Sequence, residues 1–342
     1  MTAVSMPALA SSRPRPPALA ASIGWHLLFL LAVGLPIPLL AGDSYWTDVV
    51  TMTYLFAGLS CAWNIIGGLG GQFSLGHGVF FAVGAYTTAR LYLVAGLSPW
   101  LSLPLAAALG VAIALLVSWP TFRLRGPFFA IATMAVNEVG LVLANFMEPL
   151  TGGPQGLLIP FRAGFANMIF AERWQSAVLM FGYMSCAVIA TLLVRRARLG
   201  HYLIAVHANE DAAEAAGVNV LRTKLAGMAI SAALTAVGGS LFVMYIRVID
   251  PPNLFSLPEV GVKFALIALI GGIGTVVGPV LGAFVIIPLE SWLRGALGDL
   301  TPGGHVIVLG IVLILAARFF KQGVYGKAQQ LRRSWAARAS AP

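Results

Sequence analysis

The sequence contains little charge and little cysteine. Charged residues make up 10% of its 342 positions and hydrophobic residues 59%. Soluble domains carry about 25% charged residues, so this scarcity excludes an ordinary soluble protein and indicates a polytopic membrane protein. The two cysteines, Cys61 and Cys186, lie inside apolar segments, which excludes a disulfide framework and a paired metal motif. We expect both to be packing residues.

The chain also lacks a Walker motif, a zinc signature and any segment typical of a soluble catalytic domain. We therefore expect no metal and no cofactor in this chain, and any ATPase that drives it must be a separate chain. The net charge of +9 does not predict a nucleic-acid partner, because the basic residues of membrane proteins gather in the loops that face the cytoplasm.

Apolar runs recur along the chain, and most are long enough to cross about 30 Å of hydrocarbon. We expect an all-α polytopic membrane protein with about ten transmembrane helices, some of them broken at glycines. The predicted spans are residues 22–41, 49–67, 78–96, 99–119, 126–147, 177–194, 225–246, 262–270, 276–293 and 304–320.

Both ends of the chain are basic, which predicts that both lie in the cytoplasm. Residues 1–21 should form a disordered tail, residues 22–320 the transmembrane domain, and residues 321–342 a basic cytoplasmic tail. Two cytoplasmic termini require an even number of crossings, so residues 262–293 must cross twice. We therefore predict a helix break that reverses the chain at four glycines: Gly271, Gly272, Gly274 and Gly278.

The longest polar passage is residues 195–224, which carries five basic residues and is therefore placed in the cytoplasm. In its centre Asn209 can cap a helix, and Glu210 and Asp211 would occupy the positive first turn. Gly217 can end that helix in the left-handed conformation. A helix of about two turns is marginal alone in water, so we interpret it as an element that docks on another protein.

Two kinds of motif carry a resemblance to a known family. Asp211-Ala212-Ala213, three further residues and Gly217 resemble the EAA-x3-G loop of ABC-transporter permeases, with Asp in place of the usual Glu. LivM/LivH-type permeases of branched-chain amino-acid ABC importers resemble this chain from about Asn64 to Gly326, the LivM-like branch more closely. That resemblance rests on the passages GLGGQFSLGHGVFFAVGAYTTA, LTGGPQGLLIP and GGIGTVVGPVLGA, in that order.

The resemblance implies the ABC importer permease fold and a multi-pass protein of the bacterial inner membrane. The implied function is the permease subunit of an ATP-driven importer that moves leucine, isoleucine and valine. ATPase subunits would bind ATP and Mg and dock on a coupling loop formed by Glu210, Asp211, Ala212, Ala213, Glu214 and Gly217. The other implied partners are a second permease chain, LivH-like or identical, and an extracytoplasmic solute-binding protein.

Other functions remain open at this point. Similar permeases serve other solutes, such as urea, short amides and aromatic acids. An ion-coupled secondary transporter and an intramembrane enzyme using His77 and Glu138 are the alternatives from other classes. Both would leave the docking loop without a purpose, and no metal-ligand spacing supports the enzyme.

Polar residues within or beside the apolar spans mark a candidate translocation pathway. The glycine-rich segment 67–76 must be shielded by protein, either through close helix packing or as an unwound segment that lines the solute path. A carboxylate at membrane depth is expensive, so we expect Glu138 to face the bundle interior, either in the pathway or as a hydrogen-bonded packing residue. Interhelical hydrogen bonds are likewise the alternative to solute contact for the polar groups of residues 64–77. The candidate residues are Asn64, Ser74, His77, Asn137, Glu138, Thr151 and Gly152.

Overall fold

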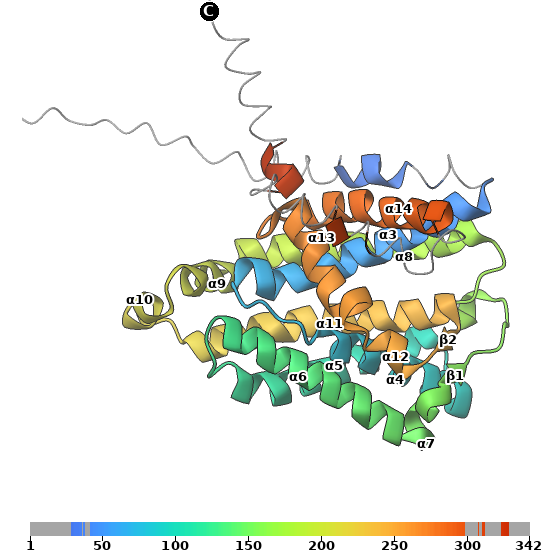
Figure 1. Cartoon of the computed structure of the whole chain (residues 1–342), viewed down its shortest axis with the longest axis horizontal. Helices are drawn as coiled ribbons and strands as arrows, with labels where there is room; N and C mark the ends of the chain where they lie inside the picture. Colours follow the sequence, from blue (N-terminus) through green and yellow to red (C-terminus); the bar gives the residue numbers. More distant parts are fainter. Residues whose placement is uncertain are drawn as a thin grey trace, which may run out of the picture.

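The computed structural model describes residues 29–35, 37, 42–297, 307, 310–311 and 323–327. Over these residues the chain is a bundle of long helices with one sheet of two short strands, β1 (Leu157–Leu158) and β2 (Val248–Ile249) (Figure 1). The expectation of an all-α polytopic membrane protein is confirmed.

Eight helical segments in the described part of the chain are long and apolar enough to cross a membrane. The count is about eight where we expected ten, and the predicted spans 22–41 and 304–320 and the tails 1–21 and 321–342 fall largely outside the described residues. The eight segments are α3 with the π-helix η1 (Ser44–Asn64, Ile65–Leu69), α4 (His77–Ala95), α5 (Pro99–Thr121), α6 (Pro127–Phe146), α8 (Arg173–Arg196), α11 (Val220–Ile246), α12 with η4 and α13 (Pro251–Leu254, Leu257–Val262, Lys263–Gly272) and α14 (Gly278–Leu297).

Several helices extend beyond the predicted apolar runs. Helix α11 begins at Val220, because the side chain of Asn219 accepts a hydrogen bond from the Arg222 amide and caps it. Residues 247–261, which lie between two predicted spans, are helical over most of their length. The polar passage 195–224 holds a further helix, α9 (Arg198–Ala208), ahead of the predicted one. Hydropathy measures transfer into lipid, so it does not report helical turns that continue into the interface.

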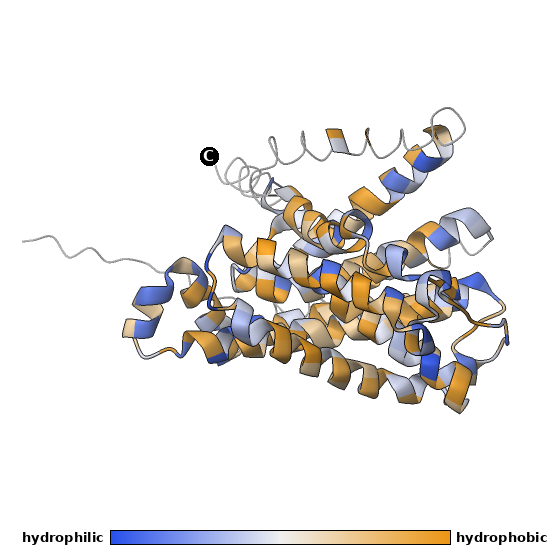
Figure 2. Ribbon diagram, turned by 60° about the horizontal axis from the view of Figure 1, so that its bottom comes forward, coloured by the Kyte–Doolittle hydropathy of each residue, from blue (hydrophilic) through white to orange (hydrophobic). Residues whose placement is uncertain are grey.

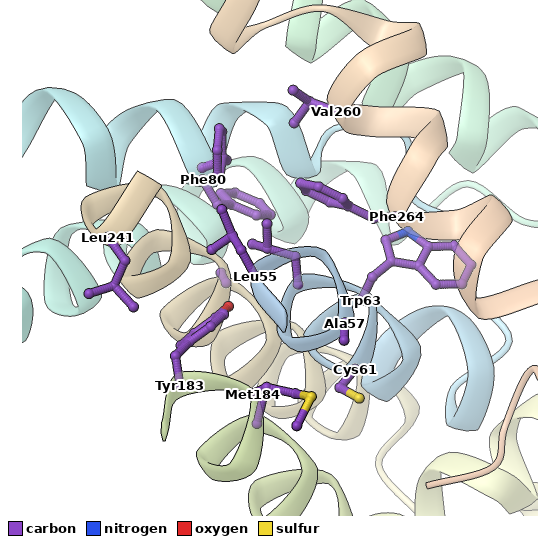
Figure 3. Close-up of a cluster of buried hydrophobic side chains, with 14 of the residues drawn as sticks. Leu55, Ala57, Cys61, Trp63, Phe80, Tyr183, Met184, Leu241, Val260 and Phe264 are labelled. Atoms are coloured by element: carbon purple, nitrogen blue, oxygen red, sulfur yellow. The ribbon is translucent and has the colours of Figure 1, made fainter. Parts of the chain in front are cut away.

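Helix α3 forms the centre of the bundle. In the 18-residue apolar stretch of α3 and η1, 89% of the residues are buried. Helix α3 packs against α8, α11, α13 and α14, and Figure 3 shows Leu55, Ala57 and Trp63 of α3 among side chains from α4, α8, α11 and α13. Cys61 belongs to this core as expected. Cys186 is exposed on α8, so its predicted packing role is wrong for the single chain.

Small residues let α11 approach its neighbours closely. A side chain at Gly239 would collide with the backbone carbonyl of Phe81 on α4, and one at Gly84 with the carbonyl of Ala236 on α11. Membrane helices commonly associate through such small-residue contacts. By contrast, α5 and α6 lie at the periphery. Only 28% and 22% of the residues in their 18-residue apolar stretches are buried.

Helices α13 and α14 form an antiparallel pair. Helix α13 ends at Gly272 and α14 begins at Gly278, and Gly271 lies against Gly278 while Gly282 lies against Ile267. The chain therefore reverses at the four glycines. This is the place where we predicted a break, because two cytoplasmic termini require an even number of crossings.

Polar residues gather at the two ends of the bundle, and apolar residues cover its middle (Figure 2). One end carries α9 and α10 (Glu210–Ala215), and β1 and β2 lie at the opposite end (Figure 1). We call these the α10 end and the sheet end.

Candidate functional site

Helix α10 begins and ends as its sequence predicts. The side chain of Asn209 accepts a hydrogen bond of 3.0 Å from the Ala212 amide, and Glu210 and Asp211 occupy the first turn. Gly217 follows the helix with φ +87°, the left-handed conformation that favours glycine. The helix is thus fixed by local contacts at both of its ends.

The exposed face of α10 differs from the one we expected. Asp211, Ala212 and Glu214 are exposed, whereas Ala213 is buried against the chain itself. Successive residues of a helix are rotated by about 100°, so Ala213 points inward while its neighbours point outward. Our interpretation of Ala213 as part of the docking surface is therefore wrong, and a bulky residue there would disturb the chain's own packing.

Glu210 ties α10 to the transmembrane helices. Its Oε1 accepts hydrogen bonds from Lys224 Nζ on α11 (2.5 Å) and from Gln72 Nε2 in the glycine-rich segment (3.3 Å). Its Oε2 lies 3.6 Å from Nε of Arg125, in the turn between α5 and α6. The Lys224 side chain is only 1% exposed, and a buried ammonium of this kind requires a partner.

Arg125 makes a second link to α10, because it donates a hydrogen bond of 3.0 Å to Asp211 Oδ1. This hydrogen bond, together with the negative charges of Asp211 and Glu210, raises the pKa of the Arg125 guanidinium. A cavity of about 370 Å³ lies beside these residues, between α10, the α5–α6 turn and the start of α11. Movement of α10 would therefore displace its bonding partners in α11, in the glycine-rich segment and in the α5–α6 turn.

The glycine-rich segment is shielded by protein, as its composition requires. It forms the π-helix η1 and then an irregular stretch up to Gly76. A side chain at Gly68 would collide with Asn64 and with the backbone of Gly274, and one at Gly71, which has φ +67°, with the ring of His207. Close packing, the first of our two interpretations, is therefore observed, and the helix is locally unwound in the same segment.

Asn64 joins the glycine-rich segment to the break between α13 and α14. Its Nδ2 donates to the Thr275 carbonyl (2.8 Å), and its Oδ1 accepts from the Gly274 amide (2.8 Å). Asn64 is fully buried. The two glycine-rich motifs, distant in sequence, thus meet in space through one amide side chain.

Ser74 and His77 are also buried and hydrogen-bonded. His77 Nδ1 lies 3.0 Å from Ser74 Oγ, and His77 Nε2 lies 2.8 Å from Ser231 Oγ on α11. Ser231 in turn donates to the carbonyl of Ala62. The contacts of Ser231 with His77 and Ala62 are interhelical hydrogen bonds of the kind that we held as the alternative to solute contact.

Asn137 and Glu138 face different directions on α6. Asn137 is fully buried and donates a hydrogen bond of 2.7 Å to the Phe255 carbonyl, and its Oδ1 is buried without a hydrogen-bond partner among the described residues. Glu138 is exposed on the surface of the single chain. The expectation that Glu138 faces the interior of this bundle is therefore wrong, because one helical step turns it away from Asn137.

Thr151 and Gly152 shape a turn at the sheet end of α6. Thr151 Oγ1 donates to the Ala144 carbonyl (2.5 Å) and accepts from the Gly153 amide (3.1 Å). Gly152 ends the short helix α7 (Glu148–Thr151) with φ +78°. Both residues make contacts typical of a structural turn.

Sequence reasoning missed the residues that hold α10 and a buried ion pair between α13 and α14. Lys263 Nζ lies 3.0 Å from Glu290 Oε1, and both side chains are about nine-tenths buried. Lys224 had been counted only among the basic residues of the passage 195–224, and Gln72 only as part of the glycine-rich segment. Arg125 lies between two predicted spans. A lysine or a glutamate within an apolar run is the only signal in the sequence, and it does not identify the partner.

Comparison with known proteins agrees with this architecture. Residues 46–317 match the family described as branched-chain amino acid transport system / permease component. The high-affinity branched-chain amino acid transport system permease proteins LivM of Salmonella typhimurium and Escherichia coli are each 30% identical over 290 residues, which cover 78% of this chain and 67% of theirs. LivH of Escherichia coli is 23% identical over 253 residues, or 69% of this chain and 81% of its own. No solved structure matches the chain.

The family match covers most of the chain, and the LivM proteins align along about three quarters of it. Together with eight apolar helices of spanning length, this identifies a multi-pass membrane protein that is a transport subunit rather than a catalytic enzyme. The chain belongs to the permease component family of branched-chain amino acid transport systems.

Proposed function

We propose that this chain is the permease subunit of an ATP-driven importer that carries leucine, isoleucine and valine across the bacterial inner membrane. The observation that carries the proposal is the geometry of α10. This short helix extends from the bundle, exposes Asp211, Ala212 and Glu214, and is bonded through Glu210 to α11 and the glycine-rich segment. A partner protein that binds such a helix can displace it, and the bonds of Glu210 would transmit that displacement to the bundle.

In this proposal the α10 end and both termini lie in the cytoplasm. ATPase subunits, which bind ATP and Mg, grip the exposed face of α10. Their closure moves α10, and the ion pair between Glu210 and Lys224 passes the movement to α11. The hydrogen bond from Gln72 to Glu210 passes the same movement to the glycine-rich segment. Asn64 connects that segment to the α13–α14 break.

A second permease chain, LivH-like or identical, would complete the pathway. Glu138 lies near the middle of α6, is exposed, and has no ion pair or hydrogen bond among the described residues. A carboxylate facing lipid at this depth costs at least about 2.5 kcal/mol. We infer that this face of α6 meets the pathway or the second permease chain, and that a solute-binding protein delivers solute at the sheet end.

Other solutes, including urea, short amides and aromatic acids, are compatible with the same architecture. An ion-coupled secondary transporter is less well supported, because it assigns no task to the exposed face of α10. An enzyme built on His77 and Glu138 is opposed by their surroundings, since His77 is sealed among serines while Glu138 lies on the exposed surface.

The deciding experiment is solute-stimulated ATP hydrolysis by the reconstituted complex, screened over leucine, isoleucine, valine, urea and short amides. We expect stimulation by the three branched-chain amino acids. A complex that transports solute without any ATPase subunit would overturn the importer, and stimulation by urea alone would overturn the choice of solute.

A further inference from the structure

A second cavity, of about 350 Å³, opens at the sheet end of the bundle. It lies between the first turns of α3 and α8, the last turn of α11, and the segment that follows β1. In the orientation proposed above, this end faces away from the cytoplasm. The volume is at the lower end of the range of about 300–1,000 Å³ that is typical of small-molecule sites.

Three charged side chains line this cavity, and they leave it with a net positive charge. Asp48 pairs with Arg173 and accepts a hydrogen bond of 2.6 Å from the Tyr245 hydroxyl, so its charge is matched. Arg247 lies with its guanidinium 4.9 Å from the centre of the Phe161 ring. No carboxylate among the described residues lies within 4.0 Å of Arg247.

The backbone holds Arg247 in an unusual conformation. The residue ends α11 with φ +65°, in the left-handed region that residues other than glycine rarely adopt. Its amide donates to the Val243 carbonyl and its carbonyl accepts from the Ile159 amide, each at 2.8 Å. Strained backbone of this kind persists only where its surroundings impose it, and it clusters at binding sites. Here it fixes the direction in which the Arg247 side chain leaves the backbone, and the guanidinium lies over the Phe161 ring at the cavity wall.

We propose that this cavity binds the carboxylate of a small apolar amino acid, with Arg247 as the carboxylate ligand. A guanidinium binds a carboxylate through two parallel hydrogen bonds, which gives both strength and orientation. Phe161, Phe170 and Ile246 line the cavity with exposed apolar surface that a branched side chain can contact. The inference rests on the proposed importer, because that function brings free amino acids to this face.

The test is binding of radiolabelled leucine to the assembled complex in nanodiscs, without the solute-binding protein. 4-Methylpentanoate, which is leucine without its amino group, should compete, and 3-methylbutylamine, which lacks the carboxylate, should not. Arg247→Gln should raise the Kd for leucine about tenfold or more, since a hydrogen bond between charged groups is lost. Arg162→Gln changes an exposed arginine that lies in the segment following β1 and does not line the cavity, so it is the matched control and should leave the Kd unchanged.

Arg247→Gly separates a lost ligand from a lost fold. Glycine adopts the left-handed conformation readily, so this variant should unfold at a temperature no lower than the parent and still lose leucine binding. The proposal is overturned if the parent complex does not bind leucine, if the amine competes as well as the acid, or if both Arg247 variants bind normally. If the proposed importer function is wrong, a different result is expected: the parent complex shows no solute-stimulated ATP hydrolysis, whether or not it binds leucine.

Discussion

Glu210→Gln removes the carboxylate that faces the buried ammonium of Lys224. The two side chains are 21% and 1% exposed, and their charged atoms lie 2.5 Å apart. Removing one partner of a buried ion pair costs about 3–5 kcal/mol, because it leaves an unmatched charge. A fifth of the Glu210 side chain is exposed, and the Phe122 ring stays 5.8 Å from the ammonium, so we expect the lower end, about 3 kcal/mol.

A double variant separates stability from coupling. Glu210→Gln combined with Lys224→Met leaves no buried charge, so most of the lost stability should return. Solute-stimulated ATP hydrolysis should stay low, because α10 has lost its ionic link to α11. The measurements are the free energy of unfolding of the purified chain in mixed micelles and ATP hydrolysis by the reconstituted complex. A coupling energy below about 1 kcal/mol, the level of an exposed pair, or normal stimulation in the double variant would refute the reasoning.

Three further changes test other parts of the structure. Gly217→Val should abolish solute-stimulated ATP hydrolysis while the chain still inserts, because φ +87° is strained for valine. Gly217→Asn should retain this hydrolysis, because asparagine tolerates that conformation. Equal activity of the two variants would contradict the assignment of α10 as the coupling helix. Asp211→Glu, which restores the commoner motif residue, should transport normally in an uptake assay. Glu138→Gln should preserve insertion and slow uptake of leucine, and unchanged uptake kinetics would make Glu138 a packing residue.

The fold class and the approximate positions of most spans were predictable because they depend on local properties. Transfer of a run of about twenty apolar residues into lipid is decided within the run itself. The ends of α10 depend on Asn209 and Gly217, which act on the nearest backbone groups. The reversal between α13 and α14 followed from counting charges at the two termini. None of these inferences needed a partner distant in sequence.

The faces of the helices were not predictable, because a helix that is apolar on all sides carries no periodic signal. The sequence placed Asn137 and Glu138 at membrane depth, and only the packing of α6 buried the first and exposed the second. The same is true of Ala213, which the resemblance placed in the coupling loop and the structure turned toward the bundle.

By itself, the sequence determined a polytopic membrane protein with a short capped helix in its most basic loop. The tertiary structure alone decided that Glu210 reaches Lys224 and Arg125, and that Asn64 reaches Gly274. It alone brought Asp48, Arg173 and Arg247 to one cavity. The physical reason is that hydropathy and capping act within a few turns of one helix, whereas a buried charge or amide is satisfied by whichever partner the packing of other helices brings within about 3 Å.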